Sequence, residues 1–151
     1  MTDSLEQLVR DIRALQSPLI LLVGPPGSGK TQMLRQLAAK LNSESINLGL
    51  ELASLLAATP NNKRGFSAGE LLREITNNHK TDGPLLLDNL ELLFEPSLQV
   101  NPLDLIKRLA HAQPVVAVWP GELRGDRLTY ADMSHPEHRD YSREGVVVFE
   151  V

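Results

Sequence analysis

The segment from Gly24 to Thr31 has the residue types and the spacing of a phosphate-binding loop. It reads Gly-Pro-Pro-Gly-Ser-Gly-Lys-Thr and fits the pattern Gly-x-x-x-x-Gly-Lys-Ser/Thr. Backbone N–H groups of such a loop and the positive end of the following helix point at one place, where they hold nucleotide phosphates. We expect Lys30 to contact the β- and γ-phosphates and the Thr31 hydroxyl to bind Mg²⁺. The predicted nucleotide-binding residues are Gly24, Pro25, Pro26, Gly27, Ser28, Gly29, Lys30, Thr31 and Gln32.

The segments on either side of the loop support this prediction. Residues 19–23 form an unbroken apolar run, which is typical of a strand buried on both faces. Residues 33–41 carry apolar side chains at helical spacing. A glycine turn that happens to precede a helix is the alternative explanation of the pattern. The order of strand, glycine loop and helix favours nucleotide binding instead.

A second informative segment ends at Asp88. Residues 84–88 read Pro-Leu-Leu-Leu-Asp, an apolar run that ends in an acid. After a phosphate loop this is the form of the Walker B strand, whose aspartate supports Mg²⁺ at the carboxyl end of the sheet. We therefore predict that Thr31 and Asp88 together hold the magnesium ion. A solvated acid at the end of a strand is the alternative for Asp88.

The residues after Asp88 include the candidates for activating a water molecule. Transfer of a phosphoryl group to water needs an oriented water and usually a proton acceptor. Asn89 can orient a water through its amide but cannot accept its proton. Glu91 is the predicted catalytic base if the turn after the strand directs it inward; otherwise it caps or covers the next helix. Glu51, after the second predicted strand, is a reserve candidate.

Alternating apolar and amphipathic segments predict the fold. Strands are expected at residues 19–23, 45–48, 84–88, 115–119 and 146–149. Helices are expected at residues 4–16, 33–41 and 51–58, from Ser67 onward, and after Asn101. Residues 122–144 are polar and charged, with few apolar positions. The alternation predicts a three-layer α/β fold with a parallel sheet. Ligands of such sheets lie outside the carboxyl ends of the strands, where Thr31, Asp88 and Trp119 fall.

The first predicted helix is amphipathic. Ser4 and Gln7 have the spacing of a capping box, and the apolar stripe is expected to pack on the edge of the sheet. Contact with a second subunit is the alternative use of that stripe. The predicted organisation is one P-loop domain over residues 1–151, with the N-terminal helix in residues 1–17 and the nucleotide-binding core in residues 18–151.

The composition indicates a cytoplasmic protein of one domain. The 151 residues are 42% hydrophobic, include no Cys and carry a formal net charge of -4. This charge gives no overall basic field, so it does not imply tight binding to nucleic acid. The absence of Cys excludes a disulfide framework and a thiolate-bound metal. No run approaches the ~20 apolar residues of a membrane span, and no secretion signal is evident, so no membrane partner is expected.

Four stretches, taken in order, resemble those of a known family. They are residues 24–31, residues 85–94 (Leu-Leu-Leu-Asp-Asn-Leu-Glu-Leu-Leu-Phe), residues 115–121 (Val-Val-Ala-Val-Trp-Pro-Gly) and residues 135–139 (His-Pro-Glu-His-Arg). Together they resemble the BrxF family, the small P-loop proteins of type 3 BREX phage-defence systems. More broadly, the chain is similar to the nucleotide-binding core of AAA+ ATPases, whose strand order is 5-1-4-3-2.

The resemblance implies an oligomer of AAA+ type that binds and hydrolyses ATP, working with DNA-modifying and defence partners in a bacterium. A six-membered ring is the family analogy. AAA+ proteins carry a helical lid with a sensor arginine, and here the sequence stops at its fifth predicted strand, so we expect the fold without the helical lid. Most also place Glu directly after the Walker B aspartate, where this chain has Asn89.

The expected lack of a lid points to a second subunit. A neighbouring subunit could close the nucleotide pocket and supply an arginine whose charge stabilises the transition state. AAA+ proteins keep that arginine between the fourth and fifth strands, where this chain has Arg124, Arg127, Arg139 and Arg143. Arg139 lies in a stretch that resembles the family and is the first candidate, and Arg143 is the second. A solvated surface position is the alternative for each of them.

Lys63 and Arg64 lie in the predicted connection after the second strand's helix. In ring ATPases this region faces the central pore, and two cations per subunit would form a basic track for a DNA backbone. An exposed flexible loop is the plainer explanation of these residues, and the sequence favours it.

Three functions stay open from the sequence. The first is an ATPase whose activity appears on self-assembly. The second is a nucleotide-gated interaction module that does not hydrolyse ATP, which Asn89 and the absent sensor arginine favour. The third is a small-molecule kinase, which is the least favoured because it needs a substrate pocket and a lid that bears arginine.

Overall fold

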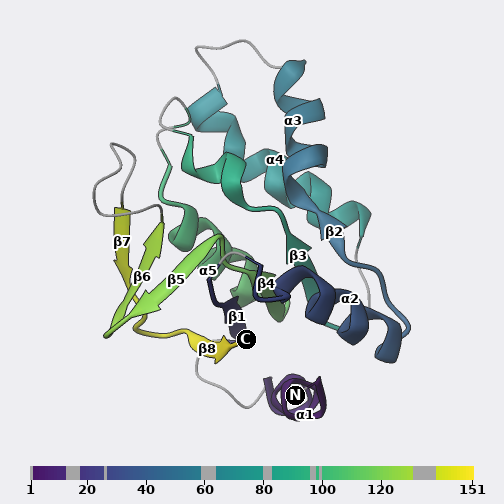
Figure 1. The fold of residues 1–151 in the computed structure, drawn as a ribbon. Helices are drawn as coiled ribbons and strands as arrows, with labels where there is room; N and C mark the ends of the chain where they lie inside the picture. Colours follow the sequence, from purple (N-terminus) through teal and green to yellow (C-terminus); the bar gives the residue numbers. More distant parts are fainter. Residues whose placement is uncertain are drawn as a thin grey trace.

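Five parallel strands form the central sheet, in the order β2-β3-β4-β1-β8 (Figure 1). The computed structural model describes residues 2–12, 18–25, 27–58, 64–79, 83–95, 98, 100–130 and 139–151. Numbered along the chain, the five strands lie in the order 5-1-4-3-2 across the sheet, so the predicted α/β fold of P-loop NTPases is confirmed. The strands are β1 (Leu19–Val23), β2 (Ile46–Asn47), β3 (Leu85–Asp88), β4 (Val115–Val118) and β8 (Val147–Glu150).

Strand β1 lies inside the sheet because its side chains are apolar on both faces. All of its residues are buried, and it pairs with β4 on one side and with β8 on the other. Leu19 and Leu21 belong to one apolar cluster, whereas Ile20 and Leu22 belong to a second one. Alternate side chains of a strand point to opposite faces, so the two clusters are the two sides of the sheet. The unbroken apolar run is therefore a strand covered on both faces, as predicted.

Helices α1 (Thr2–Asp11) and α2 (Lys30–Lys40) cover one face of the sheet. Leu5 of α1 and Leu34 of α2 are fully buried in the cluster that contains Ile20. The apolar stripe of the first helix therefore packs against α2 and this face of the sheet.

The start of α1 differs from the prediction. The helix begins at Thr2, so Ser4 lies within it and the capping box predicted for Ser4 and Gln7 is wrong. The Gln7 amide instead donates to Asp11 Oδ2 one turn further along the helix, at 3.2 Å.

The other face of the sheet is covered by elements that follow β2 and β3. Their apolar residues belong, with those of the strands, to the larger cluster, which contains most of the buried leucines among the described residues. Asn101 caps the last of these helices by accepting a hydrogen bond from the Asp104 N–H at 3.1 Å, and Pro102 begins it, as predicted. The elements are α3 (Leu48–Ala57), α4 (Arg64–Asn78), the 3₁₀ helix η3 (Glu91–Phe94) and α5 (Pro102–Ala112).

Strand β2 is shorter than predicted because a helix cap ends it. The Asn47 side chain accepts a hydrogen bond from the Leu50 N–H at 3.0 Å, so α3 begins at Leu48 rather than at Glu51. Helix α4 likewise begins at Arg64, so the loop predicted there ends earlier than expected. Lys63 lies outside the described residues.

The polar segment after β4 forms a second, antiparallel sheet that the sequence analysis missed. It consists of β5 (Gly121–Arg124), β6 (Arg127–Tyr130) and β7 (Arg139–Ser142), and it stands beside the parallel sheet (Figure 1). Gly125 has φ 58° and begins the two-residue turn between β5 and β6, a conformation that favours glycine.

An aromatic cluster attaches this second sheet to the core. The rings of Phe94 and Tyr130 stack with centroids 4.0 Å apart, and Trp119 meets Phe94 and Tyr141 edge to face at 5.3 and 5.7 Å. The Trp119 indole N–H donates to the Thr129 carbonyl at 2.9 Å, which satisfies a buried polar atom. The end of β4 is therefore held in place by both sheets. No helix in the described part of the chain is long and apolar enough to cross a membrane.

Candidate nucleotide-binding site

The glycine loop joins the carboxyl end of β1 to the first turn of α2. Gly27 and Gly29 have φ of 79° and 93°, which a residue with a Cβ adopts only with strain. A Cβ on Gly24 would lie 2.6 Å from Ser28 Oγ, so this glycine allows the loop to fold closely on itself. The loop thus places the free N–H groups of α2 at the end of the sheet, where an anion is favoured. Pro26 lies outside the described residues, and Gln32 is exposed on α2.

Lys30 is held between the loop and the end of β4. Its ammonium group donates to the carbonyls of Gly24, Trp119 and Gly121, at 2.8, 3.0 and 3.4 Å. Burial lowers the pKa of Lys30, and the carboxylates of Glu91, Glu122 and Asp88 oppose this effect, Glu91 most strongly. The cation is therefore partly desolvated, which strengthens its attraction for a phosphate group.

Thr31 and Asp88 meet at the carboxyl end of the sheet. The Thr31 hydroxyl donates to Asp88 Oδ1 at 3.3 Å, although the two residues come from α2 and β3. A hydroxyl and a carboxylate are the oxygen ligands that suit Mg²⁺, which takes its remaining ligands from water and phosphate. No group of three His, Cys, Asp or Glu residues that could hold a metal lies in the described parts of the chain, and this kind of magnesium site does not need one. The two side chains fit the ion predicted for them.

Asn89 is fixed by a neighbour that the sequence analysis did not select. Its backbone N–H donates to Asp88 Oδ1 at 2.8 Å, and its amide donates to Asn47 Oδ1 at 2.9 Å. Its φ of 62° lies in the left-handed region, which Asn tolerates better than most residues. Asn47 pairs with Asp88 in the register of β2 and β3, so its position next to the acid follows from the sheet order. The sequence analysis missed Asn47 because it lies at the end of a short strand.

The acidic residues near the site differ in their interactions with neighbouring residues. Glu91 is exposed in the first turn of η3, and its charge acts on Lys30. Glu122 also acts on Lys30, but it forms an ion pair with Arg124 at 3.2 Å. A hydrogen bond joins Glu51, the reserve candidate for the base, to His79; Glu51 Oε1 and His79 Nε2 lie 2.8 Å apart. Because Glu51 is hydrogen-bonded to His79, Glu91 stays the first candidate for the base.

The arginines of the second sheet also differ. Arg124 pairs with Glu122, and the Arg127 Nε–H donates to Asp140 at 2.9 Å. Arg143, in the turn between β7 and β8, forms no ion pair with any described residue. The backbone of Arg139 pairs with Tyr130 in the antiparallel sheet, and its side chain lies outside the description.

The partly buried position of Lys30 predicts how ATP affinity depends on pH. Bound phosphate favours the charged lysine and raises its lowered pKa, so binding takes up a proton wherever Lys30 is neutral beforehand. The affinity for ATP should therefore fall as the pH rises above the lowered pKa of Lys30 in the free protein. The effect is cleanest above about pH 8, where the phosphate groups themselves no longer titrate.

Calorimetric titration in two buffers of different ionisation enthalpy measures this proton uptake. Lys30→Arg is the matched control, because its guanidinium stays charged over the whole range and should take up no proton. Wild-type affinity that stays constant up to about pH 10, near the ordinary pKa of lysine, would contradict the expectation.

The glycine loop lies between a buried strand and a helix, and its lysine and threonine face an aspartate at the carboxyl end of a 5-1-4-3-2 sheet. These features define the class of P-loop NTPases. The family model described as ATPase family associated with various cellular activities (AAA) matches residues 20–100, more than half of the chain. The chain therefore belongs to the AAA family.

A stretch of this chain is also similar to a curated protease. Over 34 residues it is 53% identical to the Lon protease of Lachnoclostridium phytofermentans (strain ATCC 700394 / DSM 18823 / ISDg). The stretch is 22% of this chain and 4% of that protein. No solved structure matches the chain.

Proposed function

We propose that this protein binds ATP with Mg²⁺ and hydrolyses it. The proposal depends chiefly on one observation: Thr31 Oγ1 and Asp88 Oδ1 lie 3.3 Å apart beside the glycine loop. Membership of the AAA family supports ATPase activity in general terms. In this proposal the N–H groups of the loop and Lys30 hold the triphosphate, and Thr31 with Asp88 holds the ion. Mg²⁺ would neutralise charge that develops on the phosphate oxygens.

Glu91 is the proposed base, and Asn89 the proposed orienting group for the water. Glu91 lies near enough to Lys30 for its charge to act on the ammonium group. The Asn89 amide is held by Asn47, so the two form a fixed polar pair beside Asp88. A positioned carboxylate that accepts a proton typically contributes about 10²–10⁴-fold to a rate.

A nucleotide-gated module without hydrolysis is the second candidate. The observation that favours it is Asn89, which occupies the position after Asp88 and already donates its amide to Asn47. The variant Glu91→Gln distinguishes the two functions. Hydrolysis predicts that phosphate release falls by about 10²-fold or more while ATP still binds. If ATP stabilises the fold or drives assembly while wild type and Glu91→Gln both release phosphate only at the background rate, the second candidate is correct.

We propose further that two subunits share each active site. A second copy would bring an arginine to the phosphates, and such an arginine is worth about 10³–10⁵ in rate where it operates. Arg143 forms no ion pair with described residues, so its guanidinium is available to a neighbour. Arg139, the first candidate from the sequence, stays a candidate on the strength of the family resemblance.

Mixing two inactive variants tests the shared site. We expect Lys30→Ala and Arg143→Ala each to lose phosphate release alone. When they are mixed, some sites combine an intact loop from one subunit with an intact Arg143 from the other, so activity should return in part. Arg124→Ala is the matched control and should stay active, because Arg124 is paired with Glu122. If Arg143→Ala is active, the same mixture is made with Arg139→Ala; no recovery with either arginine variant would contradict a shared site.

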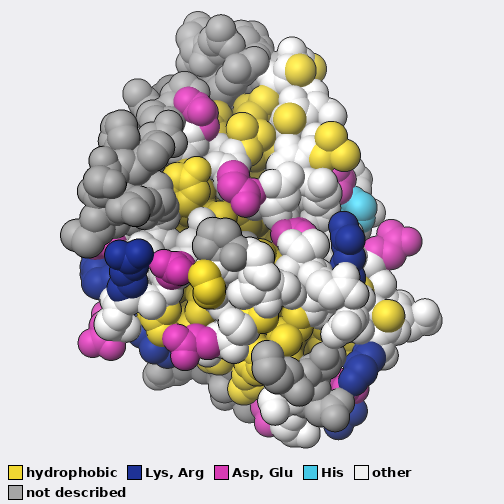
Figure 2. All heavy atoms as spheres, viewed as in Figure 1, with side chains coloured by type: hydrophobic (Ala, Val, Ile, Leu, Met, Phe, Trp, Pro, Cys, Tyr) yellow, Lys and Arg dark blue, Asp and Glu magenta, His cyan; other side chains and the backbone are white. Residues whose placement is uncertain are grey.

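A role in phage defence through BREX partners and a contact with DNA are further proposals. The resemblance of residues 85–94 and 115–121 to the BrxF family supports the first. The proposed contact with DNA depends on the two candidates from the sequence, Lys63 and Arg64, of which Arg64 begins α4. On the face in Figure 2, acidic side chains lie across the middle, and Lys and Arg lie toward the margins. In this proposal, DNA is held by cations that assembly brings together.

A further inference from the structure

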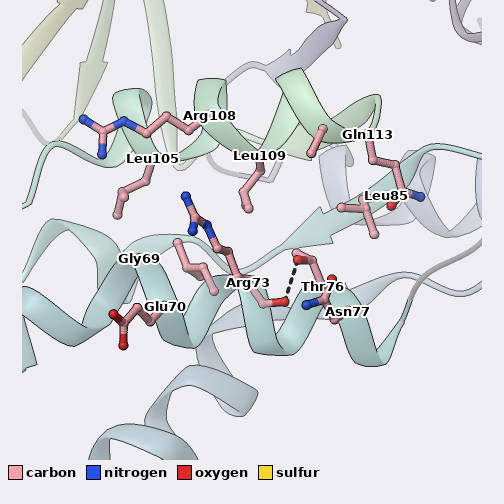
Figure 3. A pocket seen from close by; sticks show the side chains of 12 residues that line it. Gly69, Glu70, Arg73, Thr76, Asn77, Leu85, Leu105, Arg108, Leu109 and Gln113 are labelled. Carbon is pink, nitrogen blue, oxygen red and sulfur yellow. Dashed lines mark hydrogen bonds between the residues drawn. The ribbon is translucent and has the colours of Figure 1, made fainter.

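A pocket of about 460 Å³ lies between α4 and α5, away from the nucleotide site (Figure 3). Leu85 begins β3 and Gln113 precedes β4, so the pocket lies toward the amino ends of these strands. Thr31 and Asp88 lie at the opposite, carboxyl ends. The pocket is therefore separate from the proposed ATPase site.

The walls of the pocket are apolar. Leu72, Leu85, Leu105 and Leu109 line it, and all four belong to the buried core. Gly69 also lines it and leaves room where a side chain would otherwise project toward Leu105. Pockets of roughly 300–1,000 Å³ with apolar walls and a few polar groups are typical of small-molecule sites. The size and the lining both fit that class.

Two arginines from different helices give the pocket its charge. Arg73 extends from α4 toward α5, and Arg108 lies on α5 (Figure 3). Both side chains are exposed, and neither guanidinium forms an ion pair with any described residue. Among the described lining residues Glu70 is the only acid, so this part of the lining carries a net positive charge in a protein whose net charge is -4. Thr76 also lines the pocket, and its hydroxyl already donates to the Arg73 carbonyl at 3.0 Å.

We propose that this pocket binds a small amphipathic anion, with an apolar chain against the leucines and a carboxylate or phosphate between Arg73 and Arg108. A guanidinium group binds both anions with paired, charge-assisted hydrogen bonds. The leucines remove the apolar part of the ligand from water, which a free inorganic anion would not require. An uncharged ligand of the same shape would leave both arginines without a partner.

Three probes with the same alkyl chain test the charge requirement. Octanoate, octyl phosphate and octanol are titrated into the full-length protein, with binding followed by calorimetry and by leucine methyl chemical shifts. At least one anion should bind about tenfold or more tightly than octanol, since hydrogen bonds to charged groups are worth that much. The two anions show which head group is preferred. Equal binding of octanol, or no binding of either anion at millimolar concentration, would overturn the proposal.

Two sets of variants place the binding in this pocket. The double variant Arg73→Gln and Arg108→Gln should weaken binding of the anions about tenfold or more. Arg35 is an exposed arginine on α2, and Arg35→Gln should leave binding of the anions unchanged. Gly69→Met is designed to fill the pocket. A Cβ on Gly69 lies 3.7 Å from Leu105 Cδ2, an ordinary contact, and helices favour Met over Gly.

Gly69→Met should therefore melt no lower than wild type and should lose anion binding. Its affinity for ATP should stay unchanged, because the pocket and the glycine loop lie at opposite ends of the sheet. If Gly69→Met binds the anions as well as wild type does, the ligand lies elsewhere and the proposal is wrong.

Discussion

Lys30→Ala is expected to weaken ATP binding by about 100-fold or more and to abolish phosphate release. A hydrogen bond to a charged group contributes about 1.5–3 kcal/mol, and two lost phosphate contacts amount to at least about two factors of ten. The loss should be that large because the ammonium group of Lys30 is partly buried, so water screens its charge less than that of a surface lysine. A fluorescent ATP analogue measures the binding, and a phosphate assay measures the turnover.

The matched control for this variant is Lys40→Ala, on the same helix. Lys40 lies in the last turn of α2, where its contact with Glu6 at 3.6 Å is a partly exposed pair of the kind that contributes less than about 1 kcal/mol. Both variants remove one positive charge from α2, so only the position differs. Equal ATP binding by the two variants would contradict the role of Lys30.

Trp119→Ala is expected to cause the largest loss of stability. The indole is fully buried, and removing such a side chain costs about 3–5 kcal/mol. In a chain of this size that corresponds to a melting temperature lower by about 6–20 °C. The main-chain carbonyl of the same residue accepts a hydrogen bond from Lys30. Loss of the indole bond to Thr129 removes a contact that holds this carbonyl in place, so ATP affinity should fall as well.

Thermal unfolding with and without ATP measures both effects of Trp119→Ala. Leu50→Ala is the control, because Leu50 is 65% exposed and surface substitutions usually change stability by less than about 0.5 kcal/mol. If the two variants melted at the same temperature, Trp119 would not join the sheets in the way described.

The central sheet could be predicted from the sequence because its strands are continuous apolar runs. Strands β1, β3 and β4 come from segments without a polar interruption. Their order across the sheet was expected only from the resemblance to AAA+ ATPases, and the structure confirms it. Asn101 and Pro102 likewise marked the start of α5 correctly. Local chemistry decides such elements, so sequence reasoning reaches them.

The antiparallel sheet could not be predicted in the same way. Its strands are four residues long and mostly polar, and they become stable through Trp119 and Phe94, which come from other elements. The alternation of Leu128 and Tyr130 was a weak signal of a strand with one buried face. Tertiary packing, rather than local preference, decides whether such a segment is a strand.

The same limit applies to the candidate site. The loop, Lys30, Thr31 and Asp88 follow from spacing alone, and the fold brings the last two within 3.3 Å of each other. Asn47 and Glu122 were missed because neither belongs to a motif; the register of β2 and the turn after β4 place them there. Residues that are brought to the site only by the sheet order can be found only from the structure.

Calorimetric titration of ATP with and without Mg²⁺, in wild type and in Asp88→Asn, tests the central claim most directly. If Thr31 and Asp88 hold the ion beside the bound triphosphate, Mg²⁺ strengthens ATP binding in wild type. The gain disappears in Asp88→Asn, while binding without Mg²⁺ is no weaker than in wild type. An equal gain from Mg²⁺ in both proteins, or no binding of ATP to wild type at all, would contradict the account.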